Sequence, residues 1–165
     1  MSLNVQTYLD YAATTPVDER VLSAMQPYFR EMFGNPSSVH FYGQKAEAAL
    51  EGARQTVADL LHARPEEIIF TACGTESDNL ALRGVAWAQQ KKGRRHILIS
   101  PVEHHAVLHT ARQLAELNGF EVEELPVDRY GRVDPEDVRV FIRPDTALVS
   151  VIYANNEIGT INPVA

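Results

Sequence analysis

The sequence predicts an α/β fold built around a parallel sheet. After residue 63, short apolar runs alternate with helical patterns, which is typical of parallel strands joined by right-handed helical crossovers. The apolar runs show no polar alternation, as expected for strands covered by helices on both faces. Residues 1–62, in contrast, carry only helical patterns. We therefore expect an N-terminal helical arm over residues 1–62 and an α/β region over residues 63–165.

Two helices are expected in the arm. Residues 18–33 carry apolar side chains at helical spacing, and the Gly-Asn-Pro-Ser-Ser segment at 34–38 ends that pattern. An Ala-rich helical pattern covers residues 39–61, with Ser38 as its candidate N-cap. Arg64-Pro65 ends it.

The α/β region alternates in the order strand, helix, strand. Gly119 is placed to close one helix, and Asp134-Pro135 reads as N-cap and first residue of another. The expected strands are 68–70, 96–100, 120–125 and 147–152. The expected helices are 77–90, 105–118 and 134–142. A four-stranded sheet that stops soon after a polar loop looks unfinished, so we expect a piece of a longer chain.

Composition excludes several classes of protein. The formal net charge is −7, which argues against a nucleic-acid partner or an anionic membrane surface. No apolar run approaches the ~20 residues of a membrane span, and the start has no signal-peptide pattern. A single cysteine allows no internal disulfide and fits a reducing, cytoplasmic setting.

Three polar segments follow expected strands directly: 72–75, 102–105 and 154–157. In open α/β sheets, ligands bind beyond the carboxyl ends of the strands. Because parallel strands end at the same edge, we expect these segments to converge there.

The first of these segments has the features of a phosphate site. Gly74 permits close backbone approach, and Thr75 can cap the following helix and offer its hydroxyl. The free N–H groups of a first helical turn favour an anion. The alternative is an ordinary capped helix without a ligand. Cys73 is either a small structural filler, the interpretation we favour, or a thiol activated by the helix N-terminus.

The other two segments offer a histidine and an amide. His104 is placed to stack on a planar ligand or move a proton, unless local hydrogen bonds satisfy it. Asn155 can bond a ligand oxygen or belong to a plain polar turn. His105 and His109 share a helix face, as metal ligands can, but no third ligand has a recognisable spacing, so we expect no metal.

Five stretches occur together in order: YLDYAATTPVDERV, FGNPSS, IIFTACGTESDNLAL, EHHAV and NNEIGT. With them the chain resembles the cysteine desulfurases, class V aminotransferases among the fold-type I pyridoxal-phosphate (PLP) enzymes. The resemblance spans about residues 8–163. It implies an incomplete three-layer PLP-transferase large domain, with the arm contributing to a small domain and to the dimer and site region.

The resemblance also implies roles for particular residues. Gly74 and Thr75 match the cradle of the cofactor phosphate. His104 matches the catalytic histidine that stacks on the PLP ring and handles protons, and Asn155 matches the asparagine that bonds the ring hydroxyl oxygen. Positions near the substrate, matched less closely, are Ala13, Thr14 and Asn35. Cys73 departs from the family, which usually has glycine there.

The implied reaction converts L-cysteine to alanine. The sulfur passes to an enzyme persulfide and on to an acceptor or scaffold protein for iron–sulfur cluster or thiolation pathways, and relatives are homodimers. The PLP-binding lysine is not identifiable, because Lys45, Lys91 and Lys92 lack its sequence context. We therefore expect the 165-residue chain alone to be inactive. Alternatives are a selenocysteine lyase or other class V lyase, and a non-catalytic α/β fragment that oligomerises.

Overall fold

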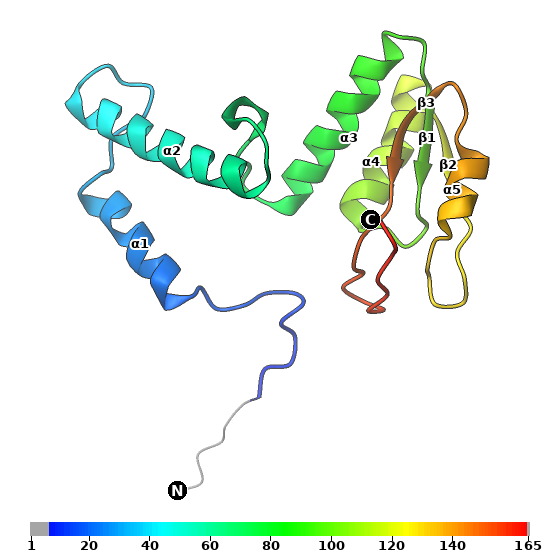
Figure 1. Cartoon of the computed structure of the whole chain (residues 1–165), viewed down its shortest axis with the longest axis horizontal. Helices are drawn as coiled ribbons and strands as arrows, with labels where there is room; N and C mark the ends of the chain where they lie inside the picture. The colour runs from blue at the N-terminus through cyan, green and yellow to red at the C-terminus, as the bar shows by residue number, and fades with distance from the viewer. Residues whose placement is uncertain (1–6, 165) are drawn as a thin grey trace, which may run out of the picture. The chain divides into compact units, whose positions relative to one another are not determined.

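A computed structural model describes residues 7–164 and shows two compact units, Met1–Phe70 and Thr71–Ala165 (Figure 1). The first unit contains helices only, and the second contains the sheet. The predicted division after residue 62, with its arm belonging to a small domain, stays a prediction.

The first unit consists of α1 (Glu19–Arg30), α2 (Phe41–Leu60) and the short 3-10 helix η1 (Pro65–Glu67). Both predicted helices are confirmed, but the predicted cap of the second is wrong. His40 caps α2, because its ring Nδ1 accepts the Gly43 N–H at 3.3 Å. The backbone carbonyl of Ser38 instead packs on Gly43, where an added Cβ would lie 2.0 Å from the Ser38 oxygen.

The strand predicted at residues 68–70 is absent, so the sheet has three strands rather than the four expected. These residues continue from η1 as irregular chain, with Ile69 67% and Phe70 46% exposed. A strand needs a hydrogen-bonding neighbour, and the described residues provide none for this segment. The Arg54 guanidinium covers the Phe70 ring at 5.0 Å.

The second unit is a parallel sheet in the order β2-β1-β3. The strands are β1 (His96–Ile99), β2 (Glu121–Glu124) and β3 (Thr146–Ser150); the helices are α3 (Gly74–Gln90), α4 (His105–Asn118) and α5 (Pro135–Phe141). Parallel pairing is confirmed. Because β2 and β3 lie on opposite sides of β1, the strand order reverses between β1 and β3, which creates a topological switch point at their carboxyl ends.

Helices cover both faces of this sheet, as predicted (Figure 1). Ile97 and Ile99 point to the face covered by α3 and α4, whereas Leu98 points to the face covered by α5. The first core comprises Leu82, Ala86, Ile97, Ile99, Val107, Ala111, Leu114 and Phe120. The second comprises Leu98, Leu125 and Val133, with Val138 and Phe141 of α5 packed against it. A core on each side holds the strand ends, and so the loops that follow them, in fixed positions.

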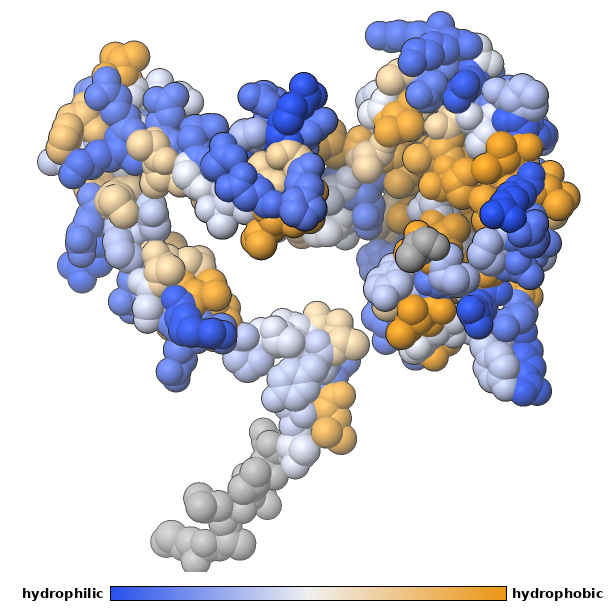
Figure 2. Space-filling model, viewed as in Figure 1, coloured by the Kyte–Doolittle hydropathy of each residue, from blue (hydrophilic) through white to orange (hydrophobic). Residues whose placement is uncertain are grey.

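Apolar side chains also reach the surface of both units (Figure 2). Helix α1 has no buried residue, although its apolar residues follow the predicted stripe; Phe29, for example, is 68% exposed. Among residues 7–164, none of the helices has the length and apolar character needed to cross a membrane.

Candidate functional site

The candidate site lies at the carboxyl ends of β1 and β3. The loop after β1 runs from Ser100 to His104, and the chain after β3 turns back at Asn155. The Asn155 side-chain Nδ2 donates a hydrogen bond of 2.8 Å to the Val102 carbonyl oxygen. This bond joins the two loops across the switch point.

His104 sits where these loops meet the start of α4. It is the N-cap of that helix, and its ring Nδ1 accepts the Ala106 N–H at 3.1 Å. Nε2 therefore carries the proton in the neutral ring. His104 lies past the end of a strand, as predicted. The local hydrogen bond that we considered as the alternative role of this histidine is present as well. One ring nitrogen remains available to a ligand.

Three pockets share His104 as a lining residue. Thr75 lines a pocket of about 590 Å³ with it, and Asp78 one of about 360 Å³. Asn155 lines a third of about 260 Å³. The structure thus gathers Thr75, His104 and Asn155 around one place, although 80 residues separate the first from the last in sequence.

The N-terminus of α3 provides unpaired backbone donors. Cys73, not Thr75, is its N-cap, so the predicted capping role of Thr75 is wrong, and Thr75 lies in the first helical turn. The Ser77 N–H reaches the Cys73 carbonyl at 3.1 Å, whereas the N–H groups of Gly74 and Thr75 find no acceptor among residues 7–164. A Cβ on Gly74 would meet nothing within 4 Å, so the protein is not packed against this side of the residue.

The side chain of Cys73 is exposed, so it is not packed as the small structural filler that we favoured from the sequence. Cys73 is the N-cap of α3, with an extended backbone (φ of −165°) and no side-chain cap bond. Glu76 Oε2 accepts the N–H of Ala72, one residue before the N-cap, at 2.7 Å, which leaves the first-turn donors of α3 unpaired within residues 7–164.

The amide of Asn155 is oriented by its surroundings. Its Oδ1 accepts the N–H groups of Glu157 and Ile158 at 2.8 and 2.9 Å, so the oxygen is fully used. One N–H of Nδ2 goes to Val102, which leaves the second as a donor. Asn155 can therefore donate to a ligand but not accept from one.

Glu103 is a buried carboxylate that the sequence interpretation passed over. It is 8% exposed, and its Oε1 lies 3.4 Å from the hydroxyl of the fully buried Ser100. Burial raises the pKa of Glu103, while hydrogen bonds from the Ile152 backbone and from the hydroxyls of Ser100 and Ser150 oppose that rise. The signal in the sequence was a lone acidic residue directly after a buried strand.

His105 and His109 do lie one turn apart on α4, with their rings stacked at 5.3 Å between centroids. They line the wall of the 590 Å³ pocket together with Arg83 and Arg112. Within residues 7–164, no group of three or more His, Cys, Asp or Glu side chains is arranged to hold a metal ion.

The predicted substrate residues Ala13, Thr14 and Asn35 belong to the first unit, so their roles stay predictions. Asn35 orders its own loop, because its Oδ1 accepts the Ser37 N–H at 2.9 Å. Ala13 and Thr14 lie in a turn whose N–H groups reach the Asp10 carbonyl oxygen at 3.1 and 3.4 Å.

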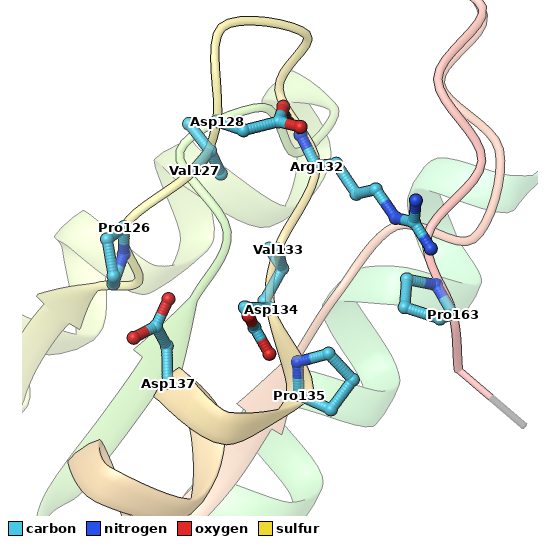
Figure 3. Close-up of a pocket in the computed structure, with 9 residues that line it drawn as sticks. All are labelled: Pro126, Val127, Asp128, Arg132, Val133, Asp134, Pro135, Asp137 and Pro163. Atoms are coloured by element: carbon cyan, nitrogen blue, oxygen red, sulfur yellow. Dashed lines mark hydrogen bonds between the residues drawn. The ribbon is translucent and has the colours of Figure 1, made fainter.

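A further pocket, of about 560 Å³, lies between the loop after β2 and the start of α5 (Figure 3). Two of its three carboxylates, Asp128 and Asp134, accept local backbone N–H groups, and the side chain of the third, Asp137, has no hydrogen-bond partner among residues 7–164. Asp134 caps α5, and Asp128 accepts the N–H groups of Arg132 and Tyr130, which lower the pKa of that carboxyl. We therefore assign this pocket no chemistry.

Buried Asn162 is a second residue that sequence reasoning missed. Its Oδ1 accepts the Val133 N–H and its Nδ2 donates to the Ile152 carbonyl, both at 2.8 Å. An Asn-Pro pair after a polar loop was its only signal. It anchors the returning chain and so fixes the turn that carries Asn155.

These observations define an α/β protein whose open parallel sheet carries a candidate ligand site at its switch point. Residues 7–165 match the aminotransferase class-V family model, and the chain belongs to that family, whose members are PLP enzymes.

The relatives are more specific. The chain is 53% identical over 159 residues to the cysteine desulfurase IscS of Dictyoglomus turgidum, covering 96% of this chain and 40% of the relative. A solved NifS-like protein superposes with a TM-score of 0.87 at 46% identity, covering 94% of this chain and 42% of that one. SspA, solved in complex with cysteine, gives 0.87 at 40% identity, covering 96% and 45%. The chain thus spans about 40% of the length of the curated relatives it matches.

Proposed function

We propose that this chain forms the phosphate- and ring-binding part of a PLP-dependent cysteine desulfurase. Such an enzyme converts L-cysteine to alanine and passes the sulfur, through an enzyme persulfide, to an acceptor or scaffold protein. The observation that carries the proposal is the convergence of Thr75, His104 and Asn155 at the switch point, in a chain of the class V family.

The residues present fit PLP at its phosphate end. The unpaired N–H groups of Gly74 and Thr75 at the start of a 17-residue helix offer donors to an anion, and the helix dipole favours negative charge there. The Thr75 hydroxyl adds a third donor. The space around the Cβ position of Gly74 is open to 4 Å.

The residues at the ring end fit as well. His104 is held by its Nδ1 bond to Ala106, so the ring plane is fixed and Nε2 can hold or release a proton. Asn155 offers one remaining N–H, suited to an anionic ring oxygen. When bound, PLP supplies an electron sink for breaking bonds at the substrate's carbons, while the protein positions the reacting groups.

No lysine of the second unit lies near this site. Lys91 and Lys92 follow α3, whose 17 residues place them about 25 Å from Gly74 at 1.5 Å per residue. Lys45 belongs to α2 in the first unit, where its ammonium lies 4.6 Å from the centre of the Phe41 ring. We propose that these 165 residues alone do not release alanine from cysteine.

The remaining assignments are also proposals. Ala13, Thr14 and Asn35 would contact substrate, and the active protein would be a cytoplasmic homodimer. The exposed apolar face of α1 supports burial against further polypeptide, and the exposed thiol of Cys73 suits a reducing compartment.

A chimera tests the function directly. Residues 7–164 replace the matching segment of the Dictyoglomus turgidum IscS, which is 53% identical. We expect the purified chimera with PLP to release alanine from cysteine, and His104→Ala to lower the rate at least 100-fold, in the range of lost general acid–base catalysis. The 165-residue chain with PLP should release none.

Two results would count against the proposal. One is a folded, PLP-loaded chimera that leaves cysteine unchanged. The other is full activity in the His104→Ala chimera. Leu117→Ala, at an exposed position near the end of the same helix, is the control and should keep activity within about threefold.

A further inference from the structure

We propose that Asn79 is a positioning residue that fixes the start of α3 against α4 and so sets the place of Thr75 relative to His104. The inference rests on the proposed function in one respect, namely that Thr75 and His104 hold opposite ends of the cofactor. Asn79 lies on α3, one turn after Thr75. The connection that it makes between the two helices is a property of this chain without any ligand.

The Asn79 amide links the first turn of α3 to the neighbouring helix. Its Nδ2 donates to the Thr75 carbonyl oxygen at 2.9 Å, and its Oδ1 accepts the Thr110 hydroxyl of α4 at 2.8 Å. Oδ1 also accepts the Nε–H of Arg83 at 3.3 Å. Because Nε can only donate and the Thr75 carbonyl can only accept, the amide has one possible orientation. A single side chain thus connects the two helices in a defined register.

The hydroxyl of Thr110 depends on this bond. Thr110 is 4% exposed, so its hydroxyl is largely shielded from water. A threonine within a helix commonly donates to the carbonyl four residues earlier in its own helix, but the Thr110 hydroxyl donates to α3 instead. Since a buried polar group without a partner is costly, we expect Asn79 and Thr110 to stay bonded.

Apolar packing between the two helices is less able to fix their register. The helices share one core (Figure 1), whose members from α3 and α4 are Leu82, Ala86, Val107, Ala111 and Leu114. Such contacts are non-directional, so they hold the helices together but oppose small displacements along the helix axes only weakly. A hydrogen bond is directional and weakens steeply when it is misaligned. The bond between Asn79 and Thr110 is therefore suited to prevent such displacements.

This bond lies close to the residues assigned to the cofactor. Thr75, Asn79, His104 and Thr110 all line the 590 Å³ pocket. Thr75 is in the first turn of α3, and His104 caps α4, six residues before Thr110. A ligand held at both helix starts requires their separation to be constant, to within roughly 0.5 Å for a productive site. Asn79 thus acts on the site through the two helices.

A spin label on Cys73 tests the proposal in the 165-residue chain without ligand. Cys73 is the only cysteine, is exposed and directly precedes α3, so a nitroxide there broadens amide resonances according to their distance from the start of that helix. Thr110→Val removes the hydroxyl and keeps the shape of the side chain, whereas Thr110→Ser keeps the hydroxyl. Gln90→Ala is the matched control, because it removes the 2.8 Å bond from Gln90 Nε2 to the Asn118 carbonyl oxygen at the other ends of the same helices.

We expect Thr110→Val to change the broadening of the Ala106 and Val107 amides at least twofold, because the starts of α3 and α4 can then move relative to each other. Thr110→Ser and Gln90→Ala should leave this broadening as it is in the natural chain. Asn79→Ala should reproduce the Thr110→Val result, and it decides the question if the Val variant does not fold.

Three results would overturn the proposal. The first is unchanged broadening in a folded Thr110→Val or Asn79→Ala chain. The second is an equal change in Gln90→Ala. The third is failure of both Thr110→Val and Asn79→Ala to fold beside a folded Gln90→Ala chain, because the bond would then stabilise the whole unit rather than position one end of it.

Two ligands connect the position of the helices to binding. Inorganic phosphate can occupy only the cradle, whereas pyridoxamine 5′-phosphate is long enough to engage His104 as well. Thr110→Val should weaken the binding of pyridoxamine 5′-phosphate at least fivefold and that of inorganic phosphate less than about twofold. Equal weakening of both would contradict the positioning role. If the natural chain binds neither ligand, the proposed function fails, while the label measurement still decides the role of Asn79.

Discussion

The side-chain amide of Asn155 and the backbone carbonyl of Val102 are joined by a hydrogen bond of 2.8 Å that spans the switch point of the sheet. Asn155 lies after β3 and Val102 after β1, so this bond sets the distance between the two loops that carry the candidate site. The same side chain accepts two N–H groups from its own turn. The Asn155 side chain therefore stabilises the fold without any ligand.

Replacing Asn155 by alanine should destabilise the second unit. The change leaves the Val102 carbonyl and two N–H groups without their partner, which we expect to cost about 1–3 kcal/mol in free energy of unfolding. Urea denaturation followed by circular dichroism measures it. Asn156→Ala, at an exposed neighbouring position, is the control and should change stability by less than about 0.5 kcal/mol. Equal effects of the two changes would contradict the assignment.

Glu103 should make stability depend on pH. Its pKa is raised above the usual value of 4.5, mainly by burial, so the folded chain holds this proton more tightly than the unfolded chain. Its contribution to stability is therefore greatest below pH 4.5 and falls as pH rises through the window up to the folded pKa. Asp78 and His104 share one pocket with Glu103, and His105 and Glu157 share another, so these are the neighbouring titratable groups.

The comparison of the natural chain with Glu103→Gln isolates this effect. The Gln variant should gain stability relative to the natural chain as pH rises from 4.5, measured as the difference between urea midpoints at each pH. A difference that stays constant from pH 4 to 8, or that changes in the opposite direction, would show that Glu103 does not have a raised pKa.

His96 should be important for joining the three strands at their amino ends. It is fully buried, with Nδ1 at 2.8 Å from the Thr146 hydroxyl of β3 and Nε2 at 3.2 Å from the Glu123 carboxylate of β2. His96→Ala removes both bonds and leaves a cavity, at an expected cost of about 2–4 kcal/mol in the free energy of unfolding. Thr146→Val removes only one of the two bonds and should cost less. A His96→Ala chain as stable as the natural one would refute this role.

Cys73 should react rapidly with a thiol reagent. Its side chain is exposed, and no cap bond holds it. Ellman's reagent should label the native chain at a rate within about threefold of that of the urea-unfolded chain, and Cys73→Ser should change stability by less than about 0.5 kcal/mol. Because Gly74 and Thr75 follow directly, a phosphate-bearing ligand in the cradle should slow the labelling. Native labelling 100-fold slower than in urea would show that the thiol is buried.

Sequence reasoning succeeded where local chemistry decides the structure. The helix at His105–Asn118 was predicted with its true bounds, because Gly119 adopts φ of 68°, a conformation that favours glycine and ends the helix. Asp134 and Pro135 begin α5 for equally local reasons, since the aspartate accepts the Glu136 N–H. The position of the candidate site at the carboxyl edge of the sheet was also predicted, because the polar segments directly follow the strands along the chain.

The predictions were wrong where a contact between residues that are distant in sequence decides the local structure. Residues 68–70 have the composition of a strand, but strand formation depends on a neighbour that the described residues do not provide. Whether Cys73 packs as a structural filler depends on what covers the start of α3. The importance of Glu103 became visible only when Ile152, nearly fifty residues later, was placed beside it.

The central claim is that this chain holds the phosphate and ring of the cofactor without its lysine. Titration with pyridoxamine 5′-phosphate, which lacks the aldehyde that would react with lysines, tests it most directly by nuclear magnetic resonance of the 165-residue chain. We predict saturable shifts of the Gly74 and Thr75 amides and of the His104 ring, and at least tenfold weaker binding in Thr75→Ala, while Leu117→Ala, at an exposed position of α4, binds as the natural chain does. Shifts confined to the basic segment at residues 91–95, or no saturable shift at Gly74, would contradict the account.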